Sequence, residues 1–187
     1  MNLARSHADF LTQSFAAQQM VSHQPYFAND KYLVQVRSQT KSLCFEYNHC
    51  EPSNTKLKGD TLKRLLPHAK GIRIEANFFC DYGVNIKAQS GVFLNHNVTI
   101  LDGAEICLGE NVLIGPNTVL AATKHAKDVD KRRAGECLSR PITIEQDAWL
   151  GANVTVLGGV TIGQGAIIGA GVVVKANVEP FSVITAS

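Results

Sequence analysis

The chain has 187 residues, of which 18% are charged, and its formal net charge is +2. This length allows one sizeable domain with or without a small appendage, and the near-neutral charge gives no reason to expect a nucleic-acid or membrane partner. Five cysteines are scattered along the chain without a CxxC pair. An odd number of cysteines with no preceding secretory signal favours free thiols in a reducing cytoplasm over a disulfide framework.

The first twenty residues mix apolar and charged side chains. Phe10, Leu11 and Phe15 stand among Arg5 and Asp9, so the segment lacks the continuous apolar run of a signal sequence or a membrane span. We expect a short amphipathic helix that docks on the rest of the chain.

Two further helices are predicted before the coils begin. The first starts near Asn29 and Asp30, where either side chain can cap free amide groups. The second lies in the segment DTLKRLLPHA, begins at Asp60 or Thr61 and has an apolar face of leucines. Residues 1–70 are therefore predicted to form a small helical cap.

From residue 142 onward, branched aliphatic residues return every six positions. The series is Ile144, Leu150, Val156, Ile162, Ile168 and Val174, and an apolar residue precedes each of them by two positions. Even offsets share one face of a strand, and glycine follows three of these residues where the chain must bend. Short strands with a bend every six residues stack into a solenoid around an aliphatic column. A β-sandwich would instead need turn clusters at roughly 8–12-residue spacing, and these are absent.

The same register is present upstream and is then interrupted. Leu108, Ile114 and Leu120 follow the six-residue spacing, which is looser between residues 86 and 100. The period disappears in the polar segment AATKHAKDVDKRRAGECLSR. A long polar excursion is uncommon in a compact solenoid unless it is functional. We therefore predict coils over 71–187 with a functional excursion at 121–141.

An ordered set of motifs around these coils is similar to a known family. In chain order the motifs are Tyr26-xxx-Asp30, Tyr47-Asn48-His49, Cys80-Asp81-Tyr82-Gly83-Val84-Asn85, Asn95-His96-Asn97, Thr123-Lys124-His125 and Trp149-Leu150-Gly151. Together with the hexads they resemble the maltose/galactoside O-acetyltransferase group of the hexapeptide-repeat acyltransferases, from about residue 13 onward. The resemblance implies a mainly β fold, namely a left-handed parallel β-helix with an α-helical cap and a long inserted loop, which assembles as a homotrimer.

The resemblance also implies an activity, the transfer of an acetyl group from acetyl-CoA to a hydroxyl of a small sugar without a metal. The hydroxyl must lose its proton as it attacks, and an imidazole can accept that proton near neutral pH. His125 is the predicted general base. From the residues alone, an ordinary surface histidine is the simpler interpretation, but the resemblance to the family favours the general base. Glu136 is the predicted acid that holds the ring, with a solvated loop carboxylate as an equal alternative. Relatives place this acid at that position or one later, where this chain has Cys137.

Binding residues are carried over from the family pattern. For the acceptor these are the short polar side chains Asp30, Asp81, Asn95 and Asp102, although Asp30 also suits a helix cap and Asn95 an asparagine ladder. Gly103 stands where a galactoside-acetylating relative has an acid, which leaves the sugar open. The pantetheine arm of the donor is expected along a groove between adjacent subunits, bound mainly by backbone groups. The predicted donor contacts are Trp149, Ala152, Ala170 and Lys175.

Three alternatives remain open. A metal-dependent hydratase of the γ-carbonic anhydrase kind needs three histidines around zinc, and only His96 and His125 lie in the coil region. A catalytically silent trimeric scaffold is kept open by Lys124 and Ala126, which depart from the family pattern. A xenobiotic alcohol such as an antibiotic could be the acceptor, although those relatives usually lack the helical cap.

Overall fold

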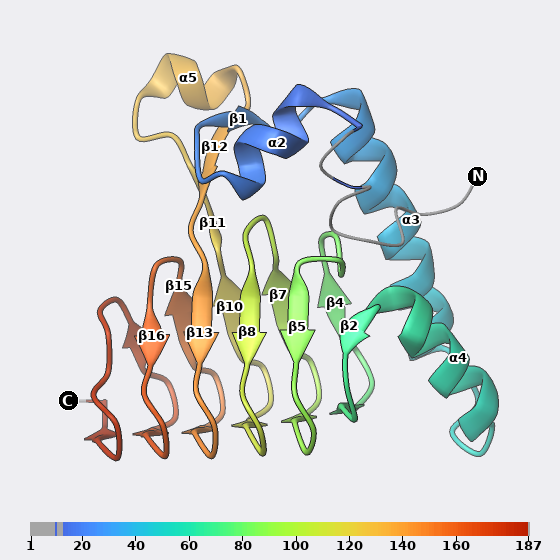
Figure 1. Ribbon diagram of the computed structural model, residues 1–187, viewed down its shortest axis with the longest axis vertical. Coiled ribbons are helices and arrows are strands. Elements are labelled where there is room, and N and C mark those ends of the chain that lie inside the picture. The colour runs from blue at the N-terminus through green and yellow to red at the C-terminus, as the bar shows by residue number, and fades with distance from the viewer. Residues whose placement is uncertain (1–9, 11–12, 187) are drawn as a thin grey trace.

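The computed structural model describes residue 10 and residues 13–186. Residues 1–9, 11–12 and 187 lie outside the described part, and most of the docking helix predicted for the first twenty residues falls there. The helix α2, Phe15–Val21, is the described portion of that region. Figure 1 shows the helical cap, in blue to teal, at the green end of a long solenoid of short strands.

The solenoid consists of three parallel sheets, and the chain passes through them in turn in each coil. The first sheet contains β2 (His68–Ala69), β5 (Ile86–Ala88), β8 (Ile106–Leu108), β13 (Ile142–Ile144) and β16 (Thr161–Ile162). The second contains β3 (Arg73–Ile74), β6 (Phe93–Leu94), β9 (Leu113–Ile114), β14 (Trp149–Leu150), β17 (Ile167–Ile168) and β19 (Val183–Ile184). The third contains β4 (Phe79–Cys80), β7 (Thr99–Leu101), β10 (Val119–Ala121), β15 (Thr155–Leu157) and β18 (Val173–Val174).

The hexad residues form the core of this solenoid, as the six-residue period predicts. Ile144, Leu150 and Val156 are fully buried, and Leu120 pairs in register with Val156 of the next coil. The inward positions of successive coils therefore stack into one aliphatic column that is removed from water. The predicted mainly β fold with a parallel β-helix is confirmed.

Asparagines turn the corners between sheets. Asn97, Asn117 and Asn153 have φ angles of 62°, 60° and 57°, a left-handed conformation that asparagine adopts more readily than other non-glycine residues. Asn97 Nδ2 also donates to Asn117 Oδ1 at 2.9 Å in the next coil. This contact is a short asparagine ladder on the corner that joins the second and third sheets.

The sequence predicts the two longer helices of the cap with different accuracy. Helix α3, Lys31–Asn48, begins where it is expected, because Asp30 accepts hydrogen bonds from the amides of Tyr32 and Leu33 at 3.1 Å. Helix α4 spans Thr55–Leu65, so the predicted start at Asp60 or Thr61 is wrong. The reason is an earlier cap: Asn54 Oδ1 accepts from the amide of Leu57 at 3.1 Å.

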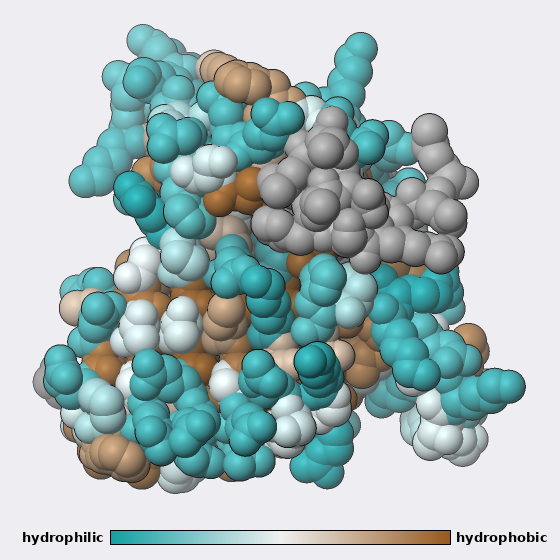
Figure 2. Space-filling view, viewed as in Figure 1, coloured by the Kyte–Doolittle hydropathy of each residue, from teal (hydrophilic) through white to brown (hydrophobic). Residues whose placement is uncertain are grey.

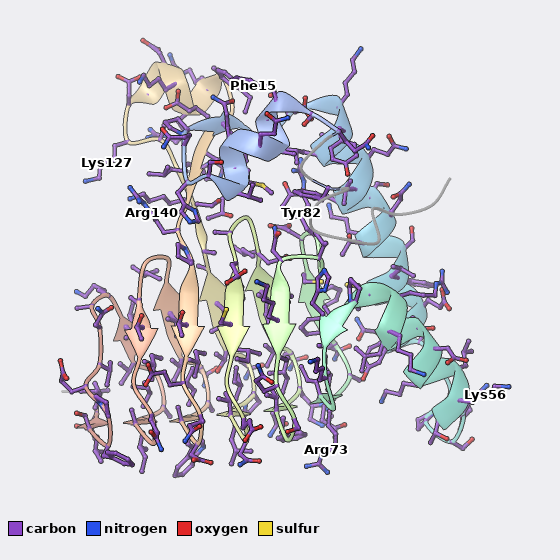
Figure 3. All side chains as sticks on the ribbon, in the orientation of Figure 1. Phe15, Lys56, Arg73, Tyr82, Lys127 and Arg140 are labelled. Carbon is purple, nitrogen blue, oxygen red and sulfur yellow. The ribbon has the colours of Figure 1, made fainter. Side chains whose placement is uncertain are left out.

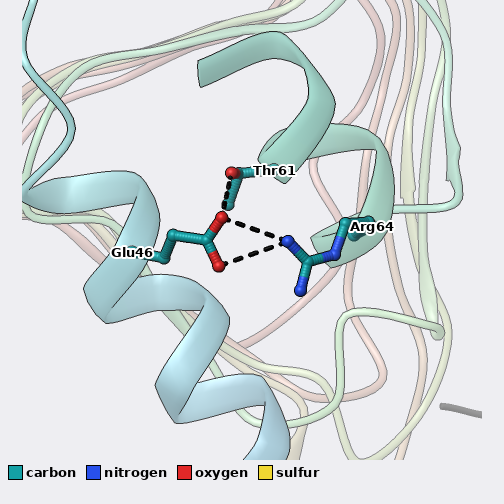
Figure 4. A network of polar contacts seen from close by, with 3 residues as sticks. All are labelled: Glu46, Thr61 and Arg64. Carbon is teal, nitrogen blue, oxygen red and sulfur yellow. Dashed lines mark hydrogen bonds and ion pairs between the residues drawn. The ribbon is translucent and has the colours of Figure 1, made fainter. Parts of the chain in front are cut away.

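Polar contacts fix α3 and α4 to each other and to the first coil. Glu46 of α3 accepts hydrogen bonds from Thr61 Oγ1 at 2.8 Å and from Arg64 Nη1 at 3.1 Å, both on α4 (Figure 4). Tyr47 donates its hydroxyl hydrogen to the carbonyl of Ile74 in the first coil at 2.6 Å. The cap is therefore docked on the solenoid through a buried hydrogen bond. Within the described residues, no helix is both long and apolar enough to cross a membrane.

The polar excursion is an antiparallel hairpin that stands out from the coils (Figure 1). It consists of β11 (Thr123–His125), the short helix α5 (Val129–Arg133) and β12 (Glu136–Ser139), and we call residues 123–139 the arm. Strand β12 also pairs with β1 (Tyr26–Phe27) of the cap, in the order β1-β12-β11. Cap and arm therefore share one small three-stranded sheet.

Candidate active site

His125 lies on the edge strand of this small sheet and is exposed to solvent. The register places His125 opposite Cys137 on β12, and Cys137 opposite Tyr26 on β1. His125 Nδ1 lies 3.4 Å from Cys137 Sγ, and within the described residues Nε2 forms no hydrogen bond. The ring nitrogen that can reach an incoming molecule is therefore Nε2.

Three hydroxyl groups hold the root of the arm. Tyr26 Oη lies 3.0 Å from Ser139 Oγ, which in turn lies 3.0 Å from Thr123 Oγ1. All three converge on Gly103, where an added Cβ atom would lie 2.2 Å from Thr123 Oγ1 and 2.4 Å from Ser139 Oγ. Burial raises the pKa of Tyr26, so its hydroxyl keeps its hydrogen near neutral pH. Sequence reasoning missed this triad; the Tyr26-xxx-Asp30 motif marked Tyr26 without its partners.

Glu136 occupies the other face of β12. Neighbouring residues in a strand point to opposite faces, so the side chains of Glu136 and Cys137 diverge. Glu136 Oε1 lies 3.8 Å from Lys131 Nζ on α5, and the described contacts include none between Glu136 and His125. The orienting role assigned to Glu136 from the sequence stays a prediction.

Asp102 and Asp81 lie one above the other on successive coils. Asp102 is fully buried, and its Oδ1 accepts from the amides of Asp81 and Tyr82 at 2.9 Å each. Its Oδ2 has no partner among the described residues, and burial raises the pKa of Asp102 to about 7. Asp102 thereby holds the backbone of Asp81, and its direct contact with an acceptor stays a prediction.

Asp81 itself is half-buried beside the cap. Burial raises the pKa of its carboxyl, and the nearby Arg37 guanidinium opposes this shift. Arg37 donates to the hydroxyl of Tyr82 at 2.5 Å and to the carbonyl of Ala28 at 2.6 Å. Figure 3 shows Tyr82 between the cap and the first coils. Asp81 thus lies at the seam where cap, arm and coils meet.

The other two predicted acceptor residues make local contacts. The Asp30 carboxylate caps α3, so its capping role is shown and its acceptor role stays a prediction. Asn95 is half-buried and its Oδ1 accepts from the amide of His96 at 2.8 Å. The asparagine ladder of this corner contains Asn97 and Asn117 instead.

The predicted donor residues lie mainly along one corner of the solenoid. Trp149 on β14 is 51% exposed, and Ala152 and Ala170 follow β14 and β17 on adjacent coils. The coils stack closely here, since a Cβ atom at Gly151 would lie 2.8 Å from the amide nitrogen of Ala170. In the described part of the chain, neither amide of the two alanines donates to another backbone group. Lys175, after β18, is exposed.

These residues form two groups on different corners. The arm with His125, together with Asp81, Asp102 and Lys175, lies where the third sheet leads back to the first. Asn95, Ala152 and Ala170 lie where the second sheet leads to the third. The strands of the third sheet between them are two or three residues long, which corresponds to roughly 7–10 Å. One chain by itself does not bring the two groups together.

A cavity of about 940 Å³ lies elsewhere, over the first sheet. Its lining includes Lys87, Cys107 and Thr143, and none of the predicted site residues contributes to it. Figure 2 views the face of the first sheet, where apolar residues are visible between hydrophilic ones. The described residues contain no group of three or more His, Cys, Asp or Glu side chains placed to hold a metal ion.

Comparison with known proteins places the chain in a family. Residues 19–71 match the maltose acetyltransferase hexapeptide capping motif, and residues 141–176 match the bacterial transferase hexapeptide with six repeats. The galactoside O-acetyltransferase of Escherichia coli is 35% identical over 131 residues, which are 70% of this chain and 64% of that protein.

Two solved structures are similar over almost the whole chain. A maltose O-acetyltransferase from Clostridium difficile has 33% identity and a TM-score of 0.87, covering 90% of this chain and 91% of that one. A galactoside acetyltransferase solved in complex with coenzyme A has 30% identity and a TM-score of 0.88, covering 93% and 88%. With the coils, the cap and the arm in place, the chain belongs to the maltose/galactoside O-acetyltransferase group of the hexapeptide-repeat acyltransferases.

Proposed function

We propose that the protein transfers an acetyl group from acetyl-CoA to a hydroxyl of a small sugar of the maltose or galactoside type, with His125 as the general base. The observation that carries this proposal is an exposed imidazole whose Nδ1 is occupied and whose Nε2 is open, on a hairpin held at its root by buried hydroxyls. Relatives named for the same activity, one of them bound to coenzyme A, support the choice of donor and acceptor.

The proposed reaction needs the acceptor hydroxyl to lose its proton as it attacks the thioester carbonyl. Nε2 of His125 takes this proton as the oxygen–carbon bond forms, and the coenzyme A thiolate leaves with the pair of electrons from the broken carbon–sulfur bond. Such general-base assistance contributes about 10²- to 10⁴-fold to the rate. His125 is therefore proposed to supply several orders of magnitude of the acceleration.

The donor is proposed to lie along the corner with Trp149, Ala152 and Ala170. The N–H groups of the two alanines donate to no other backbone group in the described chain, which suits the amide-rich pantetheine arm. The exposed indole of Trp149 offers an apolar surface for the acyl end, and Lys175 offers a charge for a phosphate. The acceptor is proposed to contact Asp30, Asp81, Asn95 and Asp102.

A homotrimer would complete this site. The two groups of residues lie on different corners, so His125 of one chain and the donor corner of another would meet across a subunit boundary. An outward-facing row on the second sheet supports such contacts, because its five members lie in register, all are apolar and three are exposed. The row consists of Phe93, Leu113, Trp149, Ile167 and Val183. A location in the cytoplasm stays a prediction.

The proposal is tested by turnover of acetyl-CoA with a panel of mono- and disaccharides, followed through the release of free thiol. We expect His125→Ala to lower kcat/KM by at least about 100-fold, because the base is removed. His49→Ala is the matched control, since His49 is an exposed histidine at the C-cap of α3 that stacks on Phe45 and lies outside the site. A loss below tenfold in His125→Ala, or turnover only with hydroxylated antibiotics, would contradict the proposal.

A further inference from the structure

We propose that the buried thiol of Cys137 is the positioning residue for His125: it holds Nδ1 and so leaves Nε2 to act as the base. This inference rests on the proposed function, because it concerns the neighbour of the proposed base. Cys137 Sγ lies 3.4 Å from His125 Nδ1, and this contact follows from the register, in which the two residues stand directly opposite each other on β12 and β11. Directly opposed residues share a face and lie close enough for side-chain contact.

Cys137 is an immobile partner. Its side chain is 2% exposed, and β12 is the central strand of the small sheet, with Tyr26 of β1 on its other side. His125 stands on the edge strand β11 and is exposed. Because an exposed side chain on an edge strand has few neighbours to restrict it, the contact with a fixed sulfur atom limits the orientations of the ring.

Within the described chain, Glu136 does not contact Nδ1 of His125. Its side chain leaves β12 on the opposite face, and its carboxylate lies 3.8 Å from Lys131 Nζ. To reach Nδ1 it would have to cross the sheet or the register would have to shift by one residue. A shift of one residue would turn every side chain of β12 to the other face and would break the hydroxyl triad at Ser139.

The thiol is uncharged near neutral pH. Burial raises the pKa of Cys137; Arg37 of α3 opposes this, while Asp81, after β4, and the adjacent Glu136 add to it. Tyr26 is the titratable group that faces it from β1. A neutral thiol sulfur can accept a hydrogen bond from Nδ1–H, which is the ring form that leaves the lone pair on Nε2. When the acceptor's O–H bond breaks and the new N–H bond forms at Nε2, the ring becomes an imidazolium and Nδ1–H still faces Sγ.

The test reads the tautomer of His125 directly. Long-range ¹H–¹⁵N correlations of the histidine-labelled protein are recorded near neutral pH, and the spectrum of His125→Ala identifies the His125 signals among those of six histidines. We expect the Nδ1–H form to dominate in the wild type. The ratio of the Nδ1–H form to the Nε2–H form should fall at least threefold in Cys137→Ala. It should return to the wild-type value in Cys137→Ser, whose hydroxyl also accepts a hydrogen bond. Glu136→Gln is the matched control and should leave the ratio unchanged.

Kinetics give the second readout. A single neutral hydrogen bond corresponds to roughly threefold to tenfold in rate, so Cys137→Ala should lower kcat by that factor with KM for acetyl-CoA unchanged, and Cys137→Ser should recover it. A dominant Nε2–H form in the wild type, an unchanged ratio in Cys137→Ala, or a change in Glu136→Gln would overturn the inference. Should His125→Ala retain turnover, the proposed function fails while the spectra still decide what holds Nδ1.

Discussion

Asp102 should make the stability of the protein depend on pH in an unusual direction. Its pKa rises from 3.8 to about 7 on folding, with burial as the largest cause. A carboxyl whose pKa is raised in the folded state stabilises that state while it is protonated. This stabilisation is complete below about pH 4 and is lost as pH rises through 7. Between pH 5 and 8 the loss amounts to about 2–3 kcal/mol, at 1.36 kcal/mol per pH unit over the two units up to the folded pKa.

The variant Asp102→Asn isolates this contribution. Asparagine keeps an Oδ1 atom for the amides of Asp81 and Tyr82 and has no charge to lose. Its amide nitrogen would replace the unpartnered Oδ2, which costs about 1–3 kcal/mol at every pH. We therefore expect the variant to be less stable than the wild type at pH 5. Between pH 5 and pH 8 the difference in the free energy of unfolding should shift by about 2–3 kcal/mol in favour of the variant.

The measurement is urea-induced unfolding of both proteins from pH 5 to pH 9 at one fixed protein concentration, because association shifts apparent stability. Other titrating groups are common to both proteins and cancel in the difference. Asp60→Asn, an exposed carboxyl on α4, is the control and should follow the wild type. If the curves of the wild type and Asp102→Asn run parallel across this range, the reasoning from burial is refuted.

Two further predictions concern local geometry. Gly103→Ala should destabilise the fold by about 1–3 kcal/mol, because the added Cβ atom would meet the hydroxyls of Thr123 and Ser139. Thermal unfolding measures this loss, and a variant as stable as the wild type would show that the root of the arm is loosely packed. Asn54→Ala should lower the free energy of unfolding by about 1 kcal/mol, because α4 loses its cap, whereas Asp60→Ala should change it by less than about 0.5 kcal/mol. A larger loss in Asp60→Ala than in Asn54→Ala would support the helix start at Asp60 that the sequence predicted.

The sequence was informative where a physical pattern repeats. The six-residue period identified the buried column because each hexad contributes the same inward position, and the stops from Ile144 to Val174 are all buried. It failed at single local events. The start of α4 depended on whether Asn54 or Asp60 caps the helix, and both residue types are favourable caps. Gly59 in the middle of α4 has a low helix propensity, and a Cβ atom added there would meet open space.

The candidate site was harder to predict because its contacts join distant segments. The sequence prediction paired His125 with Glu136 by their chemistry, and that role stays a prediction. The register of two strands, which no local pattern indicates, places Cys137 directly opposite His125. Asp102 was predicted to contact the acceptor, and its burial under Asp81 depends on the stacking of two coils. The hydroxyl triad joins residues up to 113 positions apart, which no local pattern indicates.

The pairing of β1 with β12 explains how a solenoid can carry an arm that stands out from its coils. A two-stranded hairpin that stands out from its support is marginally stable by itself. Here the cap contributes a third strand, and Tyr26 of that strand closes the hydroxyl triad at the root of the arm. The same cap supplies Arg37 beside Asp81 and docks on the first coil through Tyr47. The cap thus stabilises the arm that presents His125 and shapes the proposed acceptor side, while the coils provide the proposed donor corner. Because the third sheet separates these two parts within one chain, the proposed site requires residues of two chains to meet.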